Sequence, residues 1–166
     1  MAKKVAVIMG SDSDFATMKA SVTRLKEFGV PYEVRVISAH RTPAEAETFA
    51  KNAQANGFGV IIAAAGKAAH LAGVIAAYTT LPVIGVPIKT SMMGGLDSLL
   101  SMVQMPKGIP VATVAVDGAD NAALLAVQIL AVHDAALSQA MHAYKQNMAK
   151  EVMEKDMKIQ EEVSQI

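Results

Sequence analysis

The 166-residue chain contains no cysteine and no tryptophan, and aromatic residues make up only 4% of it. Without cysteine it can form no disulfide, no thiolate nucleophile and no cysteine-ligated metal centre. It also lacks a charge excess, because 15 Lys and Arg balance 15 Asp and Glu. Its charge balance therefore favours neither a nucleic acid nor a membrane surface as a partner. No apolar run approaches the ~20 residues that span a bilayer.

The N-terminus combines two lysines with an apolar run, a pattern that partly resembles a signal peptide. The run of residues 5–9 is short and leads directly into the polar residues 10–14, GSDSD. A secretory signal needs an apolar region of about 7–15 residues. We therefore interpret the run as a buried strand and expect a soluble, cytoplasmic protein.

Small and aliphatic residues are abundant, and hydrophobic residues make up 52% of the chain. A chain of this length is sufficient for one domain with a substantial core. The composition excludes a disordered protein and suits helices packed tightly against a buried parallel sheet.

Short apolar runs alternate with helical patterns along the sequence. Strands are expected at residues 5–9, 32–37, 60–64, 82–87 and 110–116. Helices are expected at residues 15–28, 43–56, about 66–79, 96–105 (with Asp97 or Ser98 near the cap) and 121–145. This alternation predicts an α/β fold, a three-layer α/β/α sandwich around a flavodoxin-like parallel five-stranded sheet. We expect the strand order 2-1-3-4-5.

Residues 1–145 are predicted to form this single catalytic domain, and residues 146–166 a C-terminal helical extension. Apolar residues recur in the extension near helical spacing, at Met148, Val152, Ile159, Val163 and Ile166. One interpretation is a solvated tail. Because the predicted sheet is already covered on both faces, we favour a helix that packs on a neighbouring subunit.

The loop at residues 10–14 joins the first strand to its helix. A helix N-terminus presents free N–H groups and a partial positive charge, which suit a phosphate. Ser11 and Ser13 would add hydroxyl donors, and Asp14 would accept from ribose hydroxyls. Ser and Asp are also ordinary N-caps, and from this loop alone capping is the better explanation. Neither a Walker A loop nor Gly-x-Gly-x-x-Gly is present, so a monophosphate is favoured over a triphosphate or a dinucleotide.

The second loop, residues 38–43 (SAHRTP), places His40 beside Arg41 at the end of the second strand. In open α/β sheets this edge binds ligands. Arg41 can pair with a phosphate in bidentate geometry, and His40 can move protons near neutral pH. The competing interpretations are a surface ion pair for Arg41 and a capping or packing role for His40.

The third loop contains His70 among small residues that include Gly66 and Gly73. Small residues let a backbone approach a ligand closely. A core or capping histidine is a serious alternative here, and His133 and His142 are expected at the surface of the last helix. Four histidines without clustered carboxylates predict no metal site.

Taken in order, these motifs resemble the class I PurE family of N5-carboxyaminoimidazole ribonucleotide mutases. The resemblance covers roughly residues 3–145 and rests on MGSxSD at 9–14, SAHRTP at 38–43, AAHLxG at 68–73, DSL at 97–99, VQMP at 103–106 and NAALLA at 121–126. The chain departs from the family at Lys67, a position that is often glycine, and at Ala72, which is often proline. The Lys67 ammonium either points to solvent, the interpretation favoured from the sequence, or attracts the carboxylate.

The resemblance implies an isomerase of purine (IMP) biosynthesis that forms an octamer with active sites where subunits meet. It implies transfer of a carboxylate from the exocyclic nitrogen of an aminoimidazole ribonucleotide to ring carbon C4, with no metal or cofactor. By motif position, His40 would be the general acid/base and His70 would hold the carboxylate or CO2. The implied substrate-binding residues are Ser11, Ser13, Asp14 and Arg41 at the ribose phosphate, with Ser38, Ala65, Gly66 and Leu71 lining the pocket.

Three other functions remain open from the sequence. The first is the direct carboxylase of the same family, which the segment Ala68-Ala69-His70-Leu71 disfavours because the resemblance assigns that class a different loop. The second is a flavodoxin-like binding module for flavin mononucleotide or a regulatory phosphate. The third is a purely structural protein, which only the C-terminal extension supports.

Overall fold

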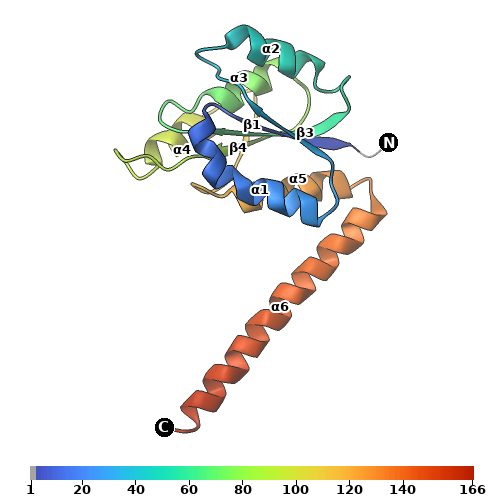
Figure 1. The fold of residues 1–166 in the computed structure, drawn as a ribbon, viewed down its shortest axis with the longest axis vertical. Coiled ribbons are helices and arrows are strands. Elements are labelled where there is room, and N and C mark those ends of the chain that lie inside the picture. The colour runs from blue at the N-terminus through green and yellow to red at the C-terminus, as the bar shows by residue number, and fades with distance from the viewer. Residues whose placement is uncertain (1–2) are drawn as a thin grey trace.

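Five parallel strands form the centre of the computed structural model, which describes residues 3–166 (Figure 1). They are β1 (Lys4–Met9), β2 (Tyr32–Val36), β3 (Phe58–Ala65), β4 (Val83–Pro87) and β5 (Ala112–Thr113). The strand order is β2-β1-β3-β4-β5, and each neighbouring pair is parallel. The order expected from the sequence is confirmed.

Helices cover both faces of this sheet, which makes the three-layer fold. They are α1 (Phe15–Glu27), preceded by the 3-10 turn η1 (Asp12–Asp14), then α2 (Pro43–Asn52), α3 (Leu71–Tyr78), α4 (Leu96–Val103), α5 (Ala119–Ala131) and α6 (Ala135–Val163). Helices α1 and α5 pack on one face of the sheet, and α2, α3 and α4 on the other. Figure 1 shows α6 leaving this layered body as a long projecting rod.

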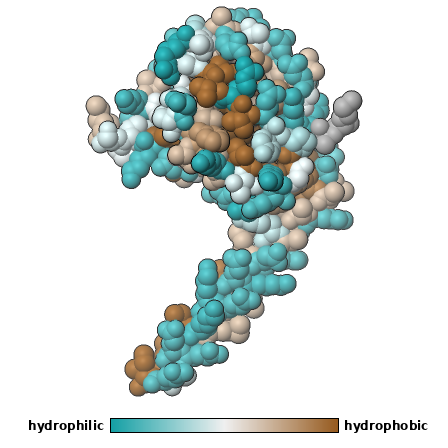
Figure 2. Space-filling view, in the orientation of Figure 1, coloured by the Kyte–Doolittle hydropathy of each residue, from teal (hydrophilic) through white to brown (hydrophobic). Residues whose placement is uncertain are grey.

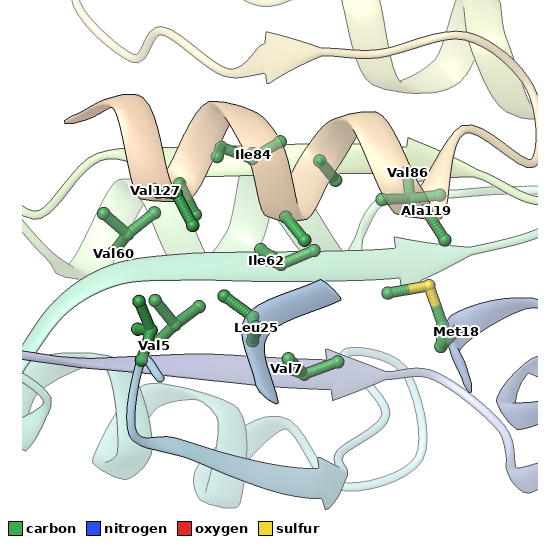
Figure 3. Close-up of a cluster of buried hydrophobic side chains, with 14 of the residues drawn as sticks. Val5, Val7, Met18, Leu25, Val60, Ile62, Ile84, Val86, Ala119 and Val127 are labelled. Carbon is green, nitrogen blue, oxygen red and sulfur yellow. The ribbon is translucent and has the colours of Figure 1, made fainter. Parts of the chain in front are cut away.

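The core consists of two apolar layers because side chains alternate along each strand. In β1, Val5 and Val7 face α1 and α5, while Ala6 and Ile8 face the opposite helices. The first layer appears in Figure 3, where strand residues such as Ile62 lie against Met18, Leu25 and Val127. Burial of both faces explains why the strands are continuous apolar runs in the sequence.

Several predicted helix boundaries are wrong. Helix α3 begins at Leu71 rather than about residue 66, because Lys67 at φ +57° lies outside the helical region, and α4 ends at Val103 rather than residue 105. Helix α2 ends at Asn52 rather than residue 56, because residues 53–57 form successive turns that close with Gly57 at φ +85°. The cap of α4 is Gly95 at φ +100°, not Asp97 or Ser98. The hydroxyl of Ser98 instead donates to the Ile88 carbonyl at 2.6 Å.

The fifth strand is shorter than expected, with only Ala112 and Thr113 in the ladder to β4. Pro110 has no N–H to donate. The segment still runs beside β4, because the N–H groups of Val114 and Asp117 donate to carbonyls of Gly85 and Pro87. Asp117 then turns the chain away at φ +57°.

The single helix expected at residues 121–145 is two helices. Helix α5 ends at Ala131, and Asp134 begins α6 as an N-cap whose carboxylate accepts from the Leu137 N–H at 3.0 Å. Helix α6 is anchored near its start, where Met141 is buried and Tyr144 meets Phe28 and Arg24 of the α1 region. From Lys145 onward, every residue of α6 is exposed.

Within residues 3–166, no helix has the length and apolarity required to cross a membrane.

Candidate active site

A cavity of about 680 Å³ opens at the carboxyl-terminal edge of the sheet, where the loops after β1, β2, β3 and β4 meet. Nine of the ten predicted site residues line it: Ser11, Ser13, Asp14, Ser38, His40, Arg41, Ala65, Gly66 and Leu71. His70 does not line the cavity, but its ring contacts His40. The structure therefore brings all ten residues to one edge.

The loop after β1 forms a compact network of hydroxyl groups. The Ser11 hydroxyl oxygen accepts from the Ser13 N–H at 3.3 Å and from the Ser13 hydroxyl at 2.9 Å. Ser11 is thus a cap of η1, as the alternative interpretation held, but both hydroxyls also face the cavity. Capping and ligand binding are compatible at this position.

Asp14 is the most buried charged residue of the site, with 9% of its surface exposed. Burial raises the pKa of the Asp14 carboxyl above its ordinary value, and hydrogen bonds from Ser13 and the Ser11 backbone offset only part of this effect. A buried carboxyl at the cavity wall is available to accept hydrogen bonds from a ligand's hydroxyl groups.

The loop after β2 is held closed by its own side chains. The Thr42 hydroxyl accepts from the Ser38 N–H and donates to the Ser38 carbonyl, both at 3.0 Å. The Ser38 hydroxyl oxygen accepts from the Arg41 N–H at 3.2 Å. This local network fixes where His40 and Arg41 leave the backbone.

The guanidinium of Arg41 connects two of the loops. Its Nη2 donates to the Gly10 carbonyl at 2.8 Å, and its Nε donates to the Ser38 hydroxyl at 3.4 Å. Both acceptors are neutral, and Arg41 forms no ion pair within residues 3–166. The surface ion pair considered for Arg41 is therefore absent from the described chain, and its positive charge remains available to an anion.

The two histidines of the site face each other across the loops after β2 and β3. Nε2 of His40 lies 3.1 Å from Nδ1 of His70, and the rings meet edge to face at 81°. His70 is exposed and its side chain makes no capping hydrogen bond, so neither alternative considered for it applies. A hydrogen bond between these nitrogens needs one proton, so a proton donor and an acceptor already stand side by side.

The loop after β3 contains the strained residue Lys67, at φ +57°. A left-handed conformation costs an L-residue roughly 1–2 kcal/mol, a cost that glycine avoids. The Lys67 carbonyl accepts from the Ala69 N–H at 2.9 Å and from the Ser101 hydroxyl of α4 at 3.4 Å. These bonds hold the turn that delivers His70 to His40.

A fourth loop, after β4, was missed as part of the site. Ile88, Lys89, Thr90 and Ser91 line the cavity, as do Ala39, Lys67 and Ala68 of the other loops. Asp117 anchors the fourth loop by accepting from the Lys89 N–H at 2.9 Å, and Asp97 accepts from the Thr90 hydroxyl at 2.7 Å. The signal was available, because the carboxyl end of every parallel strand lies at this edge.

In the described residues, 3–166, no three His, Asp or Glu side chains are grouped so that they could hold a metal ion. The imidazole pair, beside an unpaired guanidinium and a buried carboxyl, is suited to proton transfer.

Comparison with known proteins gives a consistent result. A family model described as AIR carboxylase matches residues 4–151. A Pyrococcus horikoshii protein named N5-carboxyaminoimidazole ribonucleotide mutase is 56% identical over 157 residues, covering 95% of this chain and 89% of that protein. A Schizosaccharomyces pombe protein named phosphoribosylaminoimidazole carboxylase is 53% identical over 156 residues, which cover 94% of this chain and 28% of that protein. The crystal structure of Treponema denticola PurE matches with a TM-score of 0.87 at 29% identity, covering 94% of this chain and 98% of that chain.

Proposed function

The chain belongs to the AIR carboxylase family, and on that basis we propose that it is an N5-carboxyaminoimidazole ribonucleotide mutase of purine biosynthesis. The enzyme moves a carboxylate from the exocyclic nitrogen to ring carbon C4 and acts in the cytoplasm without a metal or cofactor. The observation that carries the proposal is the 3.1 Å contact between His40 and His70 beside the unpaired Arg41.

The phosphate end of the substrate lies at the loop after β1. Arg41 reaches this loop through the Gly10 carbonyl, and the hydroxyls of Ser11 and Ser13 face the same cavity. A phosphate here would meet a guanidinium and two hydroxyl donors. Asp14, deeper in the wall, accepts from the ribose hydroxyls. Ser38, Ala65, Gly66 and Leu71 complete the pocket around the ring.

His40 performs both proton transfers. As an imidazolium it delivers a proton to the exocyclic nitrogen, the N–C bond breaks, and its electron pair stays on that nitrogen as CO2 leaves. Ring carbon C4 then attacks CO2 to form the new C–C bond. Neutral His40 removes the C4 proton, restores the aromatic ring and regains the proton that it donated. One side chain can serve both steps because an imidazole both donates and accepts protons in general acid–base catalysis.

His70 and the small residues around it retain the released CO2. The loop after β3 presents Gly66 and Ala68 to the cavity, and Ala65 and Leu71 are 7% and 2% exposed. Such a wall leaves room for a small apolar molecule and excludes water. His70 holds the carboxylate before cleavage and after recapture.

One assay separates the candidate functions. The purified protein is given either the N-carboxylated nucleotide or aminoimidazole ribonucleotide with bicarbonate, and formation of the C4-carboxylated product is followed. A mutase converts the first far more efficiently than the second. Preference for the second mixture would establish the direct carboxylase, and failure with both would leave a binding module. A yellow protein would identify bound flavin.

We also propose that the chain assembles with copies of itself into an octamer whose active sites lie at subunit interfaces. Helix α4 exposes Leu96, Leu100 and Val103, each 46–47% accessible and on one helix face. The Ser101 hydroxyl of the same helix lies 3.4 Å from the Lys67 carbonyl, so α4 packs beside the loop after β3. A second copy on α4 would bury the apolar face next to that loop. The number eight rests on the family resemblance.

The free part of α6 offers a second surface for assembly. Residues Leu137 and Met141 pack on the body, and the stripe that they begin continues as Met148, Val152, Ile159, Val163 and Ile166. At 100° per residue the six positions inside α6 lie within about 80° of one another, and Ile166 follows the end of the helix at Val163. Figure 2 shows this exposed stripe as brown side chains near the far end of α6. The start of α6 packs on the body of its own subunit. We propose that residues 146–166 pack in the same way on a neighbouring subunit.

A further inference from the structure

The cavity contains more positive charge than one phosphate contact requires. Arg41, Lys67 and Lys89 line it, while Asp14 is its only carboxylate. None of the three cations forms an ion pair with any carboxylate of residues 3–166. Burial raises the Asp14 pKa and so disfavours its charged form. The wall therefore suits a ligand with more than one anionic group.

The cations belong to different loops. Arg41 follows His40 and is bonded to the Gly10 carbonyl, at the loop with the two serines. Lys67 precedes His70 by three residues and lies in the small-residue loop after β3. The two charges are thus associated with the two parts of the site assigned to the phosphate and to the carboxylate.

The backbone at Lys67 strengthens the case for a role of its side chain. Its φ of +57° favours glycine, the residue that the family resemblance gives for this position. The hydrogen bond from the Ala69 N–H to the Lys67 carbonyl holds the turn, and a glycine at position 67 could accept it equally well. Compared with glycine, lysine at this strained position adds an ammonium group to the loop that carries His70. Strained backbone of this kind collects at functional sites.

We propose that Lys67 is a specificity-determining residue that binds the carboxylate moved by the reaction. This inference rests on the proposed mutase function. The carboxylate is anionic on the exocyclic nitrogen and on C4, and it is neutral only as CO2. Lys67 therefore strengthens binding of both carboxylated nucleotides and contributes nothing to aminoimidazole ribonucleotide, which lacks the group. Since it binds substrate and product alike, it lowers KM with little effect on kcat.

The test compares Lys67→Met, which keeps the side-chain length, with Lys67→Arg, which keeps the charge. Lys67→Met is expected to raise KM for both carboxylated nucleotides roughly five- to tenfold, the scale of one charged contact at an exposed site. Its Kd for aminoimidazole ribonucleotide, measured by calorimetry, is expected to stay within about twofold of wild type. Lys67→Arg retains most of the affinity. Lys107→Met, a lysine outside the cavity, is the matched control.

Lys67→Gly separates charge from strain. It should lose the same affinity as Lys67→Met while melting at a higher temperature than wild type, because glycine accepts the left-handed turn. Unchanged KM in Lys67→Met, or an equal loss of affinity for aminoimidazole ribonucleotide, would overturn the inference. So would a loss in Lys89→Met without one in Lys67→Met, which would assign the carboxylate to the neighbouring loop. Wild-type inactivity on the N-carboxylated nucleotide would instead refute the mutase function.

Discussion

Nε2 of His40 lies 3.1 Å from Nδ1 of His70, although the two residues are 30 positions apart in the sequence. The turn at Lys67 and the network around Ser38 hold the two loops so that the rings meet. One proton lies between the two nitrogens, and either ring can be its donor. A ligand that bonds to either ring must replace this contact or share it. Substrate binding is therefore linked to the protonation of the two rings.

The variant His40→Asn tests the general acid/base. We expect turnover to fall at least ~100-fold, the lower end of what a positioned acid/base contributes. Nucleotide affinity should stay nearly unchanged, because Arg41 and the serine loop are untouched. Steady-state kinetics and calorimetry with aminoimidazole ribonucleotide measure the two quantities. His142→Asn, in the exposed part of α6, is the matched control, and wild-type turnover in His40→Asn would remove the assignment.

The variant Arg41→Ala tests the phosphate contact. Loss of a charge-assisted contact to phosphate should weaken ribonucleotide binding roughly tenfold or more, with a smaller effect on kcat. Affinity for the dephosphorylated nucleoside should be the same in the variant and in wild type. Arg35→Ala serves as the control. Arg35 lies on β2, the strand that leads into the Arg41 loop, and its guanidinium pairs with Glu45 at 2.8 Å. Equal affinity for the ribonucleotide in Arg41→Ala and wild type would contradict the role.

Much of the fold was predictable because the strands are buried on both faces. Runs such as residues 60–64 can pack only inside a sheet, and alternation with helices indicates parallel connections. The observed strand order agrees with the expected one, which rested on the number of strands rather than on any residue. Boundaries that depend on single hydrogen bonds were not predictable. Asp134 reads as an ordinary surface residue within an Ala-rich pattern, yet its carboxylate caps α6 and breaks the predicted helix in two.

The site divides in a similar way. Residues that directly follow the first three strands were found, because the strand ends alone bring them together. The contribution of Lys89 and Thr90 was missed, since their loop carries no histidine or arginine to attract notice. The low exposure of Asp14 depends on packing that the GSDSD pattern does not encode.

Asp14 gives a prediction about pH. Its pKa is raised in the folded chain, so the folded state holds a proton that the unfolded state releases. Its contribution to stability is therefore present at low pH and is lost as the pH rises through the raised pKa. Asp14→Asn removes this loss of stability at higher pH, because an amide does not ionise. We expect its melting temperature to exceed that of wild type at pH 7, where the wild-type carboxyl bears the cost of a buried charge.

The same substitution should weaken ribonucleotide binding several-fold, because an amide replaces a carboxyl acceptor at the ribose hydroxyls. Thermal denaturation of both proteins at pH 4 and pH 7 isolates the effect of Asp14 from that of the other carboxylates. The difference between variant and wild type should shrink at pH 4. A variant that melts below wild type at pH 7, with a deficit that shrinks at pH 4, would show that folding lowers the Asp14 pKa.

Assembly through α6 gives the last prediction. The stripe after Lys145 exposes Val152 to 64% and Ile159 to 54%, and water contact of this extent favours burial against another chain. Truncation after Lys145, or the double change Val152→Glu and Ile159→Glu, should lower the number of subunits per particle, obtained by dividing the mass from light scattering by the mass of one chain. The double change Gln146→Glu and Asn147→Glu adds the same charge beside the stripe and should leave this number unaltered. Because α4 offers a separate apolar face, the altered chains should form a smaller assembly rather than monomers. An unaltered number of subunits in both the truncated chain and the Val152/Ile159 variant would show that α6 takes no part in holding the subunits together.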